Sequence, residues 1–74
     1  MEKVRIGENA GKVWHALNEV GEISLQELGR KLNLSFEDVA LAVGWLAREN
    51  KVFIQKKKDI LVISNENRYN PYFG

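Results

Sequence analysis

Two serine-capped helix starts in the middle of this sequence limit its possible folds more than any other feature. Ser24 is followed three residues later by Glu27, and Ser35 is followed three residues later by Asp38. In this pattern, called a capping box, the serine hydroxyl accepts a backbone hydrogen bond and the acidic side chain reaches back to the serine amide. The two boxes predict a short helix over about residues 25–32, a tight turn, and a longer helix over about residues 36–49.

A further helix is predicted before the first box. Apolar residues recur there at spacings of three and four, which is typical of one helix face; they are Ile6, Ala10, Val13, Trp14, Leu17 and Val20. Asn9 is a plausible N-cap, and Gly21 stands where a left-handed glycine commonly ends a helix. The pattern therefore predicts a helix over about residues 9–20.

The residues after the third helix predict a β-hairpin. Residues 51–55 and 60–64 are rich in Val, Ile and Phe, which favour strands. The segment between them, Lys-Lys-Lys-Asp at residues 56–59, contains no Asn-Gly or Gly-Gly pair. We therefore expect a four-residue loop at the tip of the hairpin rather than a two-residue turn.

This order of elements is that of a winged helix-turn-helix, an α+β fold with three helices followed by a two-stranded β-hairpin wing. A chain of 74 residues has room for one domain. We predict this domain over residues 1–64 and an irregular aromatic tail over residues 65–74. The alternative is another α+β arrangement of three helices and a hairpin.

Two tryptophan-containing segments carry a resemblance to a known family. Asn9-Ala10-Gly11-Lys12-Val13-Trp14 and Gly44-Trp45-Leu46-Ala47-Arg48-Glu49 resemble motifs of a small stand-alone winged-helix family of uncharacterised bacterial proteins. Residues 28–52 also look like the helix-turn-helix and wing entry of many bacterial transcription regulators. The resemblance covers about residues 6–64 and implies the fold, but it implies no particular chemistry.

The inventory of reactive side chains argues against an enzyme. His15 is the only histidine and the chain has no cysteine, which excludes the usual zinc ligand sets. The six glycines are scattered, so no phosphate-binding loop is present. We expect no catalytic residue, cofactor, metal or small-molecule ligand. Because no apolar stretch could span a membrane and no signal peptide is evident, we expect a cytoplasmic protein.

The uneven distribution of charge bears on nucleic-acid binding. The net charge is only +1, but residues 51–64 hold four lysines and one aspartate. The outward positions of the third helix, which would enter the major groove, are Glu37, Asp38, Leu41 and Trp45, with Arg48 a turn later. The start of this helix thus has no Lys, Arg, Asn or Gln to read bases, and its two carboxylates would face phosphates. We therefore predict contacts with double-stranded DNA mainly through phosphates. The residues concerned are Arg30, Lys31, Arg48, Lys56, Lys57 and Lys58. A solvated turn is the alternative for the three consecutive lysines.

A protein interface is the second hypothesis for the same region. Leu41 and Trp45 would form an apolar strip on the outer side of the third helix. Tyr72 and Phe73 of the tail would cover this strip, either within one chain or mutually between two chains. The predicted partner is a second copy of the chain, in a homodimer. Alternatively, Trp45 packs on its own hairpin. The fold favours a nucleic-acid-binding transcriptional regulator, whereas the charge of the third helix favours a self-associating module without DNA binding.

Overall fold

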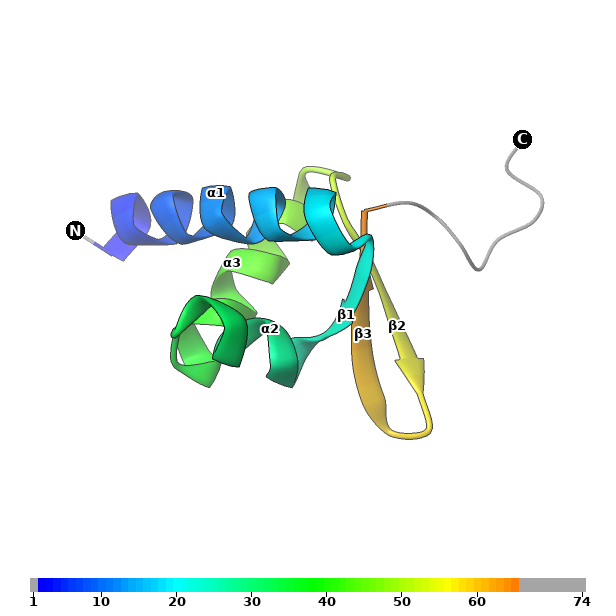
Figure 1. The fold of residues 1–74 in the computed structure, drawn as a ribbon. Helices are drawn as coiled ribbons and strands as arrows, with labels where there is room; N and C mark the ends of the chain where they lie inside the picture. The colour runs from blue at the N-terminus through cyan, green and yellow to red at the C-terminus, as the bar shows by residue number, and fades with distance from the viewer. Residues whose placement is uncertain (1, 66–74) are drawn as a thin grey trace.

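Three helices and a three-stranded antiparallel sheet form the part of the chain that the structure, a computed structural model, describes: residues 2–65 (Figure 1). The elements in chain order are α1 (Glu2–Val20), β1 (Glu22–Ser24), α2 (Leu25–Leu32), α3 (Phe36–Arg48), β2 (Phe53–Lys57) and β3 (Ile60–Ser64). The predicted interface residues Tyr72 and Phe73 lie outside the described residues.

The two predicted serine caps are confirmed. The Glu27 amide donates to Ser24 Oγ at 3.1 Å, and the Asp38 amide donates to Ser35 Oγ at the same distance. Asn33 closes α2 in the left-handed conformation, with φ of 56°. Because Asn tolerates this conformation, the chain can turn sharply into α3. The helix-turn-helix therefore forms as the caps predicted.

The first helix begins much earlier than predicted. Asn9 is buried inside α1, so its prediction as an N-cap is wrong. Half-buried Ile6 continues the apolar stripe by one turn, and Arg5 pairs with Asp38 of α3 at 2.6 Å. These contacts hold the first two turns of α1 against the start of α3. At the other end, Gly21 terminates the helix as predicted, with φ of 80°.

Strand β1 was not predicted. Its central residue Ile23 lies opposite Ile63 of β3, and β3 lies between β1 and β2 in the sheet. Three residues are too few to show the alternation by which a strand is detected in a sequence. The strand nevertheless ties the link between α1 and α2 to the wing.

The wing turn is tighter than predicted. Lys57 pairs with Ile60, which leaves only Lys58 and Asp59 in the turn, both at positive φ (49° and 67°). The expected four-residue loop is therefore wrong. We attribute the tight turn to the register of the strands: Ile63 is fully buried, and a shift by one residue would turn it to solvent.

The predicted start of β2 at Lys51 is also wrong, because Asn50 and Lys51 form the C-terminal cap of α3. Asn50 is left-handed, with φ of 60°, and the Lys51 amide donates to Leu46 O at 2.9 Å. These features are typical of a Schellman closure. Strand pairing therefore begins only at Phe53.

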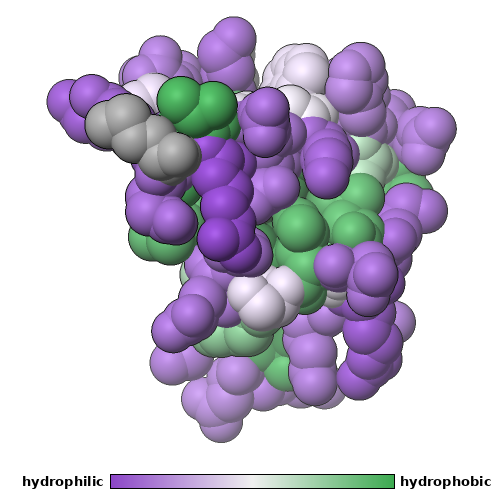
Figure 2. All heavy atoms as spheres, turned by 90° about the vertical axis from the view of Figure 1, so that its left-hand side faces the viewer, coloured by the Kyte–Doolittle hydropathy of each residue, from purple (hydrophilic) through white to green (hydrophobic). Residues whose placement is uncertain are grey.

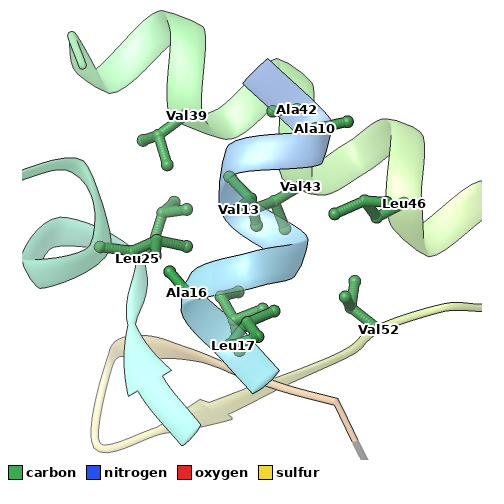
Figure 3. Packing of buried hydrophobic residues seen from close by; sticks show 12 residues of the cluster. Ala10, Val13, Ala16, Leu17, Leu25, Val39, Ala42, Val43, Leu46 and Val52 are labelled. Atoms are coloured by element: carbon green, nitrogen blue, oxygen red, sulfur yellow. The ribbon is translucent and has the colours of Figure 1, made fainter. Parts of the chain in front are cut away.

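The core lies where α1 crosses α3 above α2 and the sheet (Figure 3). Its buried apolar residues are Ala10, Val13, Ala16, Leu17, Leu25, Leu28, Val39, Ala42, Val43, Leu46, Val52 and Ile63. A Cβ on Gly29 would lie 3.3 Å from both Leu34 O and Val39 Cγ1, so this glycine allows a close approach between α2 and α3. Phe36, at the start of α3, lies outside the core and is 63% exposed.

Candidate nucleic-acid interface

The first turns of α2 and α3 meet the tip of the wing at one end of the molecule, away from α1 (Figure 1). Two adjoining hollows share Leu25, Gln26 and Phe36 as lining residues. One continues along α2 to Arg30, and the other reaches residues 59–61 of the wing. We call this region the wing-side surface and define it by the lining residues Gln26, Arg30, Phe36 and Ile60, together with Lys56 and Lys58 of the adjoining wing.

The three predicted wing lysines do not point the same way. Lys56 lies opposite Leu61 in the strand pairing, so the two side chains share a face of the sheet, and Leu61 lines the hollow beside the helices. Lys57 belongs to the opposite face, because successive strand residues alternate. Its Nζ lies 3.5 Å from Glu22 Oε2. The structure therefore places Lys56 at the wing-side surface and pairs Lys57 elsewhere.

The other three predicted cations are also dispersed. Arg30 lines the hollow beside Phe36, whereas the neighbouring Lys31 is exposed and is not among the residues that line it. Arg48 is in the last turn of α3, roughly 18 Å along the helix axis from Phe36. The six residues predicted to bind phosphate thus do not form one cluster, and Arg30 and Lys56 are the two that lie toward the wing-side surface.

The acidic start of α3 faces α1 instead of the wing. Glu37 and Asp38 line a hollow with Glu2, Arg5 and Leu41, which together we call the α1-side surface. Arg5 Nη2 lies 2.6 Å from Asp38 Oδ2, and this hydrogen bond and charge raise the pKa of the guanidinium above its already high value. Figure 2 views the molecule from the side where α1 begins and shows apolar surface enclosed by hydrophilic side chains. One of the two carboxylates expected to face phosphates is therefore paired within the protein.

Gln26 is a candidate that the sequence analysis missed. It is exposed in the first turn of α2 and lines both hollows of the wing-side surface. Its amide can donate and accept hydrogen bonds at a base edge, as Gln does with adenine. The sequence places Gln26 inside the Ser24 capping box and therefore in the first turn of the second helix. It was missed because base-reading residues were expected only on the third helix.

The predicted apolar strip on α3 is exposed, with 53% of Leu41 and 37% of Trp45 accessible. Trp45 lines a hollow together with Trp14, Gly7 and Gly11 of α1. Trp45 therefore borders α1 across this hollow.

Within residues 2–65, no group of three or more His, Cys, Asp or Glu side chains is placed to hold a metal ion. None of the helices in that range combines the length and apolar character needed to cross a membrane.

Comparison with known proteins identifies the family. The family described as "Winged helix-turn-helix domain (DUF2582)" matches residues 1–65. The chain belongs to this family. An uncharacterised relative from Methanocaldococcus jannaschii is 47% identical over 55 residues, spanning 70% of this chain and 77% of the relative.

A solved structure supports the same fold for this DUF2582 domain. A protein of Bacteroides thetaiotaomicron, determined in solution by NMR, is 59% identical and superimposes with a TM-score of 0.82. The match covers 100% of this chain and 90% of that protein. The predicted α+β winged helix-turn-helix is confirmed. The names of these two relatives state no ligand and no activity.

Proposed function

We propose that this DUF2582 domain binds double-stranded nucleic acid through its wing-side surface, mainly by contacts with phosphates. The observation that carries the proposal is the separation of charge around the start of α3. Arg30 and Lys56 lie on the side next to the wing, where Asp59 also lines a hollow. Glu37 and Asp38 lie on the side next to α1, where Asp38 is paired with Arg5. A duplex approaching from the wing would meet cations on both sides of Phe36.

The outer face of α3 supports weak rather than strong sequence preference. Its exposed residues include Glu37, Leu41, Gly44, Trp45 and Arg48, and only Trp45 and Arg48 can donate hydrogen bonds from their side chains. Phosphate contacts position a protein on a duplex but carry no direct sequence information. Gln26, at the edge of this surface, is the best placed candidate for a base contact. A role as a small transcriptional regulator would then depend largely on DNA shape.

Salt-dependent titration of a duplex with matched lysine variants tests the proposal. Each phosphate contact contributes about 0.9 to the slope of log affinity against log salt. We expect Lys56→Ala and Lys58→Ala each to reduce the slope by about that amount. Lys57→Ala is the control within the same wing, because this side chain is paired with Glu22 on the other face of the sheet.

Two outcomes would contradict the proposal. One is a wild-type protein that binds no duplex even at low salt. The other is an equal loss of slope in all three variants, which would mean that the lysines act only as a diffuse positive charge. Thermal unfolding of each variant checks that the fold is retained.

A second candidate function is self-association through α3, and the exposure of Leu41 and Trp45 favours it. Contiguous exposed apolar residues beside a tryptophan often mark protein interfaces. In such a homodimer Trp45→Ala should shift the species toward monomer. Analytical ultracentrifugation measures this directly, and a wild-type mass of 8.5 kDa at high concentration would rule the dimer out.

A further inference from the structure

The hollow that reaches residues 59–61 of the wing differs in chemistry from its neighbour beside Arg30. It has a volume of about 210 Å³, and four of its six lining residues are apolar: Leu25, Phe36, Ile60 and Leu61. The other two are Gln26 and Asp59, so no cation among the described residues lines it. This hollow is therefore unsuited to a phosphate group and suited to an apolar group that lies beside a hydrogen-bonding one.

Phe36, the first residue of α3, lies between the hollows at this end of the molecule. It lines this hollow, the one beside Arg30 and the α1-side hollow, and 63% of its surface is exposed. The staple positions around the Ser35 cap belong to half-buried Leu34 and buried Val39, so the start of α3 does not need Phe36. A large apolar ring that is exposed without a packing role is available to contact a ligand.

The chemistry of Gln26 and Phe36 matches that of one kind of base pair. In the major groove, thymine presents its C5-methyl group, which makes apolar contacts with side chains such as Phe. Adenine, the partner of thymine, presents N6 and N7, which form two hydrogen bonds with the amide of Gln. Because Gln26 and Phe36 line the same two hollows, they are placed to meet the two bases of an A·T pair together.

The charges around this hollow fit the same ligand. Arg30 lies one turn after Gln26 on the same face of α2, and Lys56 shares a face of the sheet with Leu61. These cations lie beside the hollow, where they can meet the phosphates that border a groove. Asp59 lies at the hollow itself, and its charge repels a phosphate but not the uncharged edge of a base pair.

We propose that the wing-side surface prefers A·T base pairs, with Phe36 packed on a thymine methyl group and Gln26 hydrogen-bonded to adenine. This inference rests on the proposed function, binding of a duplex, and adds the base pair that is read. Two contacts give only a modest preference, in keeping with the start of α3, which has no Lys, Arg, Asn or Gln.

Duplexes that differ only in methyl groups test the contact of Phe36. One is an alternating A-T duplex, and the other has uracil in place of every thymine, so the position of the protein on the duplex does not matter. Burial of one methyl group is worth about fourfold in affinity. We therefore expect wild-type protein to bind the thymine duplex about fourfold more tightly at the same salt concentration, and Phe36→Ala to bind both duplexes equally.

Phe53→Ala is the matched control for this loss. Phe53 is an exposed aromatic residue of β2, with 38% of its surface accessible, and it lines neither hollow of the wing-side surface. Its removal should leave the preference for thymine over uracil unchanged. Because Phe36 is the more exposed of the two rings, both variants should fold, and thermal unfolding checks this.

A change of one atom in adenine tests the contact of Gln26. An alternating duplex with 7-deazaadenine lacks the N7 acceptor, and loss of one hydrogen bond is worth about fivefold in affinity. Wild-type protein should show this loss, and Gln26→Ala should not. Gln55→Ala is the control, because Gln55 lies in β2 and lines neither hollow.

The outcomes separate this inference from the proposed function. Equal affinity of the wild type for the thymine and uracil duplexes overturns the inference, whereas the binding of both duplexes still supports the proposed function. A thymine preference that persists in Phe36→Ala also overturns it, because the preference then comes from the shape of the duplex. Binding of no duplex at low salt contradicts the proposed function and the inference together.

Discussion

The inner and outer faces of α3 differ in burial and in the kinds of side chain that they present. The inner face presents Val39, Ala42, Val43 and Leu46 to α1 and α2, and all four are buried. The outer face presents Glu37, Leu41, Gly44 and Arg48 to solvent. The inner face has the features that the winged-helix fold requires, whereas the outer face has no Lys, Arg, Asn or Gln near the start of the helix, where base-reading residues are expected.

This difference shows why the fold does not by itself specify how DNA is read. The packing of α3 depends on its inner residues, which any winged helix needs for stability. The proposed nucleic-acid contact instead depends on neighbours of α3, namely Gln26 and Arg30 of α2 and Lys56 and Lys58 of the wing. Variants that compare the two faces test this separation.

The largest difference is expected between two leucines of α3. Leu46 is 5% exposed, so Leu46→Ala should lower the free energy of unfolding by about 2–5 kcal/mol. Leu41 is 53% exposed, so Leu41→Ala should change it by no more than about 0.5 kcal/mol. Urea denaturation measures both. Similar losses in the two variants would mean that Leu41 is buried in an assembly of the protein in solution.

Two helical glycines should respond in opposite directions to alanine. Gly29→Ala places a Cβ 3.3 Å from Leu34 O and Val39 Cγ1, which costs about 1–3 kcal/mol by overpacking. Gly44→Ala has open space and should stabilise α3 by up to about 1 kcal/mol. Melting temperatures of the two variants should therefore fall on opposite sides of the wild type. A stabilised Gly29→Ala would refute the close approach of α2 to α3.

A smaller effect is expected at the cap from which both faces of α3 start. Ser35→Ala removes the acceptor of the Asp38 amide and should cost about 1 kcal/mol of stability. Ser35→Asp keeps an acceptor and serves as the control. If thermal unfolding does not distinguish the alanine from the aspartate variant, the hydroxyl does not cap this helix in solution.

Much of the fold could be predicted from local signals. The Ser24 and Ser35 boxes placed α2 and α3 because capping depends on neighbouring residues alone. The features that were missed depend on contacts between distant segments. The early start of α1 depends on the pairing of Arg5 with Asp38, and the two-residue wing turn accompanies the burial of Ile63.

The candidate site was predicted less completely for the same reason. Sequence analysis identified the basic wing, but only the strand register shows that Lys56 faces the helices while Lys57 pairs with Glu22. Similarly, the two acidic residues at the start of α3 looked unfavourable for DNA until Asp38 was found bound to Arg5. Gln26 could be recognised only after α2 and the wing were placed side by side.

The most direct test of the central claim is an NMR titration of the full, isotope-labelled chain with a short duplex of mixed sequence at low salt. The account predicts chemical-shift changes in the first turn of α2 and in residues 56–60 of the wing, and their reversal at high salt because phosphate contacts are screened. Changes confined to the outer face of α3, or no changes at all, would contradict it.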